Sequence, residues 1–179
     1  TCLSTNPVDG MCSDSEYGAM PDWDVRNVTD MSETFFQRRN FNADIGSWDV
    51  SKVTDMSYMF FFGEMGVVDA STFNQDIGSW DVSNVTDMNY MFYQAESFNQ
   101  DLSSWNVSNV SKCFGFCFGS DSWDLSKPNF TNRFVKEKNL CLYHSLFELT
   151  RRWRNKEFYL EFEKTSLFKK SSNLQRFIS

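Results

Sequence analysis

The residues that could carry chemistry in this chain are mainly aspartates, and they recur at regular intervals. They form three rows, with one member in each interval: Asp44, Asp76 and Asp101; Asp24, Asp49 and Asp81; Asp30, Asp55 and Asp87. Paired carboxylates can hydrolyse a glycosidic bond, and rows of oxygen ligands suit Ca²⁺. Aspartates beside turns also accept hydrogen bonds from nearby backbone amides. We favour this capping role, with calcium binding or a charged partner-binding face as the alternatives.

Few other residues suggest catalysis. His144 is the only histidine, which excludes a HExxH site or another multi-histidine metal centre. The aspartates are copied in every interval, and such copying argues for structure over chemistry. We therefore predict a protein that is not an enzyme and that needs no cofactor. If calcium binds, the weak candidate ligands are Asp44, Asp76 and Asp101.

The aspartates belong to an internal repeat, which is the main feature of the sequence. The sequence motif WDVSNVTDM, which begins at Trp80, has near-copies that begin at Trp23, Trp48 and Trp105. Successive tryptophans lie 25, 32 and 25 residues apart, and the longer interval holds its extra residues within 61–72. A period of 25 residues is typical of a solenoid, in which each unit buries its apolar face against the next.

Each unit is predicted to contain a short strand, a turn and a short helix. Apolar and polar residues alternate over 73–77, as in a strand, and a Gly-Ser turn follows. Thr86 is expected to cap a helix, because the apolar residues within 85–92 fall at helical spacing. The predicted fold class is an α/β repeat solenoid of short, leucine-rich-repeat-like coils.

The predicted core is one set of large apolar side chains copied along the repeats. Its members are Trp23, Trp48, Trp80, Trp105, Phe41, Phe73, Phe98, Met56, Met88, Phe60 and Phe92. Burial of each tryptophan is worth roughly 2–3 kcal/mol. An exposed aromatic row that binds sugars is the alternative interpretation of these residues.

Composition divides the chain into three segments. Residues 1–22 are predicted to form an N-terminal cap, 23–127 a solenoid of four to five repeats, and 128–179 a basic segment of uncertain structure. The formal charge is −13 for residues 1–127 and +6 for the remainder. Three interpretations of the basic segment are open. It contacts an anionic surface, it lies across the acidic solenoid, or it is not native coding sequence. We predict no transmembrane segment and no nucleic-acid partner.

The five cysteines suggest different roles. Cys2 and Cys12 precede the first repeat and are the candidate disulfide, which would close a cap over the open end of the solenoid. Cys113 and Cys117 replace larger apolar residues of the preceding unit. We expect them to be small core residues rather than metal ligands or a redox pair. Because five is odd, at least one thiol should stay free or pair between chains.

A row of hydroxyl side chains lies next to the third aspartate row. Its members are Thr29, Thr54, Thr86 and Ser111. Regular threonine rows can bind ice on flat solenoids, but each of these residues precedes the expected start of a helix. We therefore predict that they are N-caps.

The unit FNQDIGSWDVSNVTDMNYMF, residues 73–92, resembles the BspA-like leucine-rich-repeat surface proteins, which have many copies in mycoplasma lipoproteins and in marine algae and protists. The resemblance covers roughly Trp23 to Asp124. It implies an extracellular or cell-surface protein that binds a protein or glycan without catalysis, and it supplies no active site. A calcium-dependent surface-coat protein is the first alternative to this adhesion module, and a glycan-acting enzyme is the second.

Overall fold

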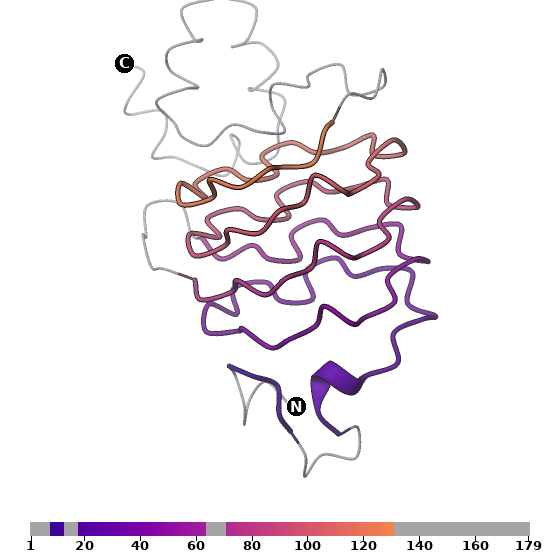
Figure 1. The fold of residues 1–179 in the computed structure, drawn as a ribbon, viewed down its shortest axis with the longest axis vertical. Coiled ribbons are helices and arrows are strands. Elements are labelled where there is room, and N and C mark those ends of the chain that lie inside the picture. Colours follow the sequence, from indigo (N-terminus) through magenta and orange to yellow (C-terminus); the bar gives the residue numbers. More distant parts are fainter. Residues whose placement is uncertain (1–7, 13–17, 64–70, 131–179) are drawn as a thin grey trace, which may run out of the picture. The chain divides into compact units, whose positions relative to one another are not determined.

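The computed structural model describes residues 8–12, 18–63 and 71–130 of the chain. The chain divides into two compact units, Thr1–His144 and Ser145–Ser179, and the described residues all belong to the first. They form four coils, which we define as residues 23–47, 48–79, 80–104 and 105–130. Figure 1 shows these coils one above another, coloured from purple to orange.

Equivalent segments of successive coils run parallel to each other. Isolated parallel β-bridges join Asp30 to Asp55, Asp55 to Asp87 and Asp87 to Lys112. Beyond each bridge, alternate N–H groups of one coil donate to carbonyl groups of the next. The coils are therefore held together by backbone hydrogen bonds between residues that are 24 to 33 positions apart, such as Phe60 N to Met91 O at 2.8 Å.

The helix and strand expected within each unit are not formed in the described residues. The one helix there is η1, a 3-10 helix at Met20–Asp22, and pairing between coils is limited to isolated bridges. Residues 89–94 instead form turns, in which Tyr90 has a φ of 54° and Gln94 a φ of 53°. The physical reason is that alternate N–H groups, those of Tyr90, Phe92 and Gln94, donate to the next coil, whereas a helix would direct them to residues four positions earlier.

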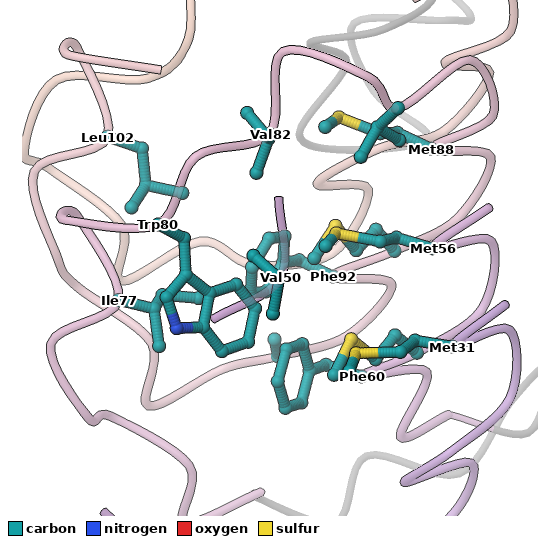
Figure 2. Close-up of a cluster of buried hydrophobic side chains, with 14 of the residues drawn as sticks. Met31, Val50, Met56, Phe60, Ile77, Trp80, Val82, Met88, Phe92 and Leu102 are labelled. Atoms are coloured by element: carbon teal, nitrogen blue, oxygen red, sulfur yellow. The ribbon is translucent and has the colours of Figure 1, made fainter. Parts of the chain in front are cut away.

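Large apolar side chains fill the inside of the coils. Figure 2 shows Met31, Met56 and Met88 at equivalent places in successive coils, with Phe60 and Phe92 beside them. The buried members of the set predicted as core are Trp48, Trp80, Trp105, Phe41, Phe73, Phe98, Met56, Met88, Phe60 and Phe92. Trp23 differs, because it is only partly buried and packs against the edge of this cluster.

The buried tryptophans also link each coil to the chain before it. The indole Nε1 of Trp80 donates to the carbonyl oxygen of Ile45 at 3.1 Å, and that of Trp105 donates to Ile77 at 3.1 Å. Trp48 makes the corresponding bond to Met20 at 3.2 Å. A buried indole N–H needs such an acceptor, so the tryptophans combine apolar burial with a fixed position in the stack.

Residues 8–12 lie against the first coil. Asn42 N donates to Val8 O at 2.6 Å, and Met20 N donates to Gly10 O at 2.9 Å. Cys12 is buried and disulfide-bonded. Its predicted partner Cys2 lies outside the described residues, so the Cys2–Cys12 pairing stays a prediction. The same holds for the structure of the basic segment beyond residue 130.

Candidate functional site

The repeated aspartates stabilise turns of the backbone. Asp44 Oδ1 accepts a hydrogen bond from Gly46 N at 3.1 Å, and Asp76 Oδ1 accepts one from Gly78 N at 2.9 Å. Asp101 accepts in the same way from the amide two residues on. Nine residues in the repeats make this bond, and we call them the turn aspartates: Asp24, Asp30, Asp44, Asp49, Asp55, Asp76, Asp81, Asp87 and Asp101. They have the geometry of Asx turns, as the capping interpretation predicts.

Hydrogen bonds to the carboxylates favour their ionised form. The pKa of Asp49 lies below its usual value because the side chain and then the backbone amide of Ser51 donate to it. Serine two residues on lowers the pKa of Asp81 in the same way. The guanidinium of Arg26, 2.7 Å from Asp24, donates to that carboxylate and lowers its pKa to about 2. Asp24, Asp49 and Asp81 are therefore charged at neutral pH.

The candidate calcium ligands are spread along the stack. Asp44, Asp76 and Asp101 lie on three successive coils, and each uses one carboxylate oxygen for its own turn. Among residues 8–12, 18–63 and 71–130, no three acidic, cysteine or histidine side chains gather as a metal-binding group. The described geometry thus gives each of these aspartates a structural role, and calcium binding draws no support from it.

In the row of Asp30, Asp55 and Asp87, a lysine holds the equivalent position in the fourth coil. Lys112 Nζ lies 2.9 Å from Asp87 Oδ2 and joins the third coil to the fourth. The carboxylate is largely buried, with 11% of its side chain exposed, whereas the lysine side chain is 65% exposed. The pKa of Lys112 is raised, first by its hydrogen bond to Asp87 and then by the charge of that residue. This ion pair stabilises the fourth coil on the third.

The hydroxyl row also links neighbouring coils. Thr86 Oγ1 donates to Thr54 O at 3.1 Å, and Thr54 Oγ1 donates to Thr29 O at 3.1 Å. Ser111 makes the same bond to Thr86 O at 3.2 Å. The prediction of N-caps is wrong for Thr54, Thr86 and Ser111, because no helix follows them and their hydroxyl groups bond across coils instead.

An aromatic row outside the core was not identified from the sequence. Phe36, Phe61, Tyr93 and Phe118 occupy the same place in successive coils, and we call these four residues the aromatic row. Their neighbouring ring centroids lie 5.0, 4.5 and 5.3 Å apart, with interplanar angles of 15°, 9° and 8°. Tyr93 is buried and the three phenylalanines are half-buried. The signal for this row was the aromatic residue that directly follows each core position at 35, 60, 92 and 117.

Tyrosines beside this row adopt an unusual backbone conformation. Tyr58 and Tyr90 have φ values of 58° and 54°, and their rings stack with centroids 5.1 Å apart. Gly115 holds the equivalent place in the fourth coil, with a φ of 61°. A bulky residue at positive φ is uncommon, and such strain clusters at functional sites. Burial raises the pKa of both tyrosines, so both are neutral at physiological pH.

The two cysteines of the fourth coil differ in oxidation state. Cys113 is buried and takes part in a disulfide, whereas Cys117 is a buried thiol. The prediction that Cys113 is only a small core residue is therefore incomplete. The spacing of the cysteines held no signal for this bond, since Cys113 occupies the place of Met88 in the third coil.

No helix among the described residues is both long enough and apolar enough to span a bilayer.

Comparison with known proteins gives one family. A search of curated proteins found no match, and neither did a search of solved structures. A family model described as "Mycoplasma protein of unknown function, DUF285" matches residues 8–133, which is more than half of the chain. This match agrees with the mycoplasma part of the resemblance, while the BspA-like assignment stays a prediction. The chain belongs to the DUF285 family.

Proposed function

We propose that the chain is a leucine-rich-repeat-like solenoid of the BspA type that binds a protein partner without catalysis. The observation that carries this proposal is the aromatic row. Phe36, Phe61 and Phe118 are half-buried apolar side chains on one side of the stack, outside the core. Aromatic residues are enriched where proteins bind proteins, because they bury much area at a small cost in conformational entropy.

The ring geometry favours a protein over a glycan as ligand. A sugar packs against the open face of an aromatic ring, but the rings of the aromatic row cover one another's faces. Phe61 and Tyr93, for example, stack with centroids 4.5 Å apart and planes 9° apart. Ring edges remain, and they suit the apolar side chains and carbonyl groups of a polypeptide.

The repeated carboxylates support a role without catalysis. A general acid or nucleophile must be free to act on a substrate, whereas each turn aspartate already bonds to its own backbone. Copies in successive coils have the same partner, two residues on, so none is distinguished as a reacting group. This use of the carboxylates also leaves the calcium-dependent alternative without a supporting observation.

The cysteines support a location outside the cell or at its surface. Cys12 and Cys113 are both disulfide-bonded. Structural disulfides persist in oxidising compartments and are rare in a reducing cytosol. The proposed location is therefore extracellular or cell-surface, in line with the resemblance to surface proteins.

The test is a binding screen with a matched pair of variants. The full chain is applied to a displayed protein library and to a glycan array, together with Phe61→Ser and with Ser79→Ala. Ser79 is exposed, and its hydroxyl group donates to Gly46 O rather than contacting the aromatic row. Binding to proteins that Phe61→Ser abolishes and Ser79→Ala preserves would support the proposal. Selective binding to glycans, or protein binding that Phe61→Ser leaves intact, would overturn it.

A further inference from the structure

The first coil presents an edge at which backbone groups have no partner among the described residues. At each interface between coils, four N–H groups of one coil donate to four carbonyl groups of the coil that follows it. The accepting residues are Asp55, Ser57, Met59 and Phe61 in the second coil, Asp87, Asn89, Met91 and Tyr93 in the third, and Lys112, Phe114, Phe116 and Phe118 in the fourth. No described residue donates to the equivalent carbonyl groups of the first coil. We call the residues that carry them the open edge: Asp30, Ser32, Thr34 and Phe36.

Thr29 adds hydrogen-bond donors to the open edge. Thr54 N and Thr54 Oγ1 both donate to Thr29 O, at 2.8 and 3.1 Å, and Thr86 makes the same two bonds to Thr54 O. The N–H and hydroxyl groups of Thr29 hold the equivalent place in the first coil, and no acceptor for them lies within the described part of the chain. The edge therefore offers the same acceptors and donors by which each later coil binds the coil before it.

The open edge is accessible to solvent. Asp30 is exposed, whereas Asp87, at the equivalent place in the third coil, is buried. Thr34 is exposed as well. Residues 8–12 do not pair with this segment, because their backbone bond to the first coil is made at Asn42. An unpaired edge of this kind is a template on which another extended chain can pair.

The charge of Asp30 indicates one feature of the segment that would occupy the edge. Asp87, in the same row, forms an ion pair with Lys112 of the neighbouring coil at 2.9 Å. Asp30 forms no ion pair with a basic side chain of the described residues. Glu33, three residues on, is also exposed and adds to the negative charge. A basic residue in a neighbouring strand would therefore face Asp30 as Lys112 faces Asp87.

The ring of Phe36 indicates a second feature. Phe36 is the first member of the aromatic row and stacks on Phe61, whereas Phe61 and Tyr93 each have ring neighbours in the coils on both sides. One end of the aromatic row thus lies at the open edge. In each coil, the member of the aromatic row lies six positions after the member of the row that contains Asp30. A strand with an aromatic residue six positions after its basic residue would continue both rows.

We propose that the open edge binds an extended segment of a partner protein, which runs parallel to the first coil. This inference rests on the proposed function and gives the partner a place and a chemistry. The segment donates alternate backbone N–H groups to the open edge and accepts hydrogen bonds from Thr29. It carries a lysine or arginine opposite Asp30 and an aromatic residue opposite Phe36. Strand addition of this kind takes its affinity from main-chain hydrogen bonds and its specificity from alternate side chains.

The test uses a synthetic peptide as the probe and the full chain as the receptor. The peptide TKMNYMFYQ copies residues 86–94, which donate to the fourth coil, with lysine at the place of Asp87. One modified peptide is N-methylated at the place of Phe92, whose N–H donates to the next coil. Its matched control is N-methylated at the place of Asn89, whose N–H bonds to Asp87 Oδ1 instead. Binding is measured by fluorescence anisotropy of the labelled peptides and by hydrogen exchange of the Thr29 amide.

Two variants of the chain separate the edge from charge elsewhere on the stack. Asp30→Asn and Asp55→Asn each remove one carboxylate and keep the oxygen that accepts from the turn amide. Both are produced in bacteria, because each change creates an Asn-X-Ser sequence that a eukaryotic secretory host would glycosylate. We expect Asp30→Asn to weaken peptide binding about twofold to fivefold, and Asp55→Asn, one coil further away, to weaken it less.

Binding of the unmodified peptide with slower exchange of the Thr29 amide would support the proposal. N-methylation at the place of Phe92 should weaken that binding at least about tenfold, because it blocks a main-chain hydrogen bond, and N-methylation at the place of Asn89 should preserve it. Absence of binding, or an equal effect of the two methyl groups or of the two substitutions, would overturn the proposal. A dimer of the free chain without peptide binding would assign the edge to a second copy and would also overturn it. Failure here is distinct from failure of the proposed function, which is measured by the effect of Phe61→Ser on library binding.

Discussion

Replacement of Phe60 by alanine should be among the most damaging single changes to the stack. The Phe60 side chain is fully buried, and its ring centroid lies 4.1 Å from that of Phe73 and 5.3 Å from that of Phe92. Its ring centroid also lies 5.5 Å from that of Phe35 in the first coil, so Phe60 contacts residues of three successive coils. Truncation of such a side chain costs about 3–5 kcal/mol, because apolar burial is lost and a cavity remains. Additional loss of stacking contacts places Phe60 towards the upper end of that range.

Phe61 supplies a matched control at the next residue. It is half-buried and contacts rings of the aromatic row rather than the core, so Phe61→Ala should cost about 1–2 kcal/mol. Both variants remove the same atoms from adjacent positions of one coil. Urea unfolding, followed by tryptophan fluorescence and by circular dichroism, gives the two free energies of unfolding. If Phe60→Ala lowered the free energy of unfolding no more than Phe61→Ala does, the assignment of Phe60 to the shared core would be refuted.

Three further changes test the packing and the polar groups. Gly46→Ala should lower the free energy of unfolding by about 1–3 kcal/mol in urea titrations, because its Cβ would lie 2.5 Å from the backbone oxygen of Asp76. Ser71→Ala should raise it by about 1 kcal/mol in the same assay, since the Ser71 hydroxyl is buried and has no hydrogen-bond partner among the described residues. Burial raises the pKa of Tyr90 above its usual value of 10.0, so its contribution to stability is complete below that pH and is lost as the pH rises further. Tyr90→Phe should therefore reduce the loss of stability above pH 10, measured as urea midpoints, and an unchanged alkaline profile would contradict this account.

The positions of the core could be predicted because their physical requirement is local and repeated. Residues equivalent to Phe73, Trp80 and Met88 recur in successive units. An apolar residue that is repeated in this way points into the interior shared by the coils. The turn role of the aspartates was predictable for the same reason, because an Asx turn joins residues only two positions apart. The sequence therefore contained enough information for these features.

Features that depend on the neighbouring coil were harder to predict. The spacing of Val85, Met88 and Phe92 suits a helix, but the N–H groups of Met88 and Phe92 donate to the next coil instead. Thr86 resembles an N-cap by its place before an aspartate, yet its hydroxyl bonds to Thr54, which is 32 residues earlier. Local periodicity cannot distinguish a helix from a turn whose hydrogen bonds are completed by another repeat.

The aromatic row and the disulfide of Cys113 were missed for related reasons. Phe36, Phe61 and Phe118 follow core residues directly, and the sequence does not show that their rings stack on one another rather than entering the core. Cys113 occupies the place of Met88 in the preceding coil, so its position in the repeat did not mark it for a disulfide. The stacking of the rings depends on how the coils are placed against each other, which a one-dimensional period does not specify.

The tryptophan hydrogen bonds give the stack a direction of assembly. The indole of Trp80 bonds to Ile45 O and that of Trp105 to Ile77 O, so each acceptor lies earlier in the chain than its donor. As a chain emerges from the ribosome, each new tryptophan finds its acceptor in a segment that has already been made. Coils can then be added in order of synthesis, with every completed coil serving as the template for its successor.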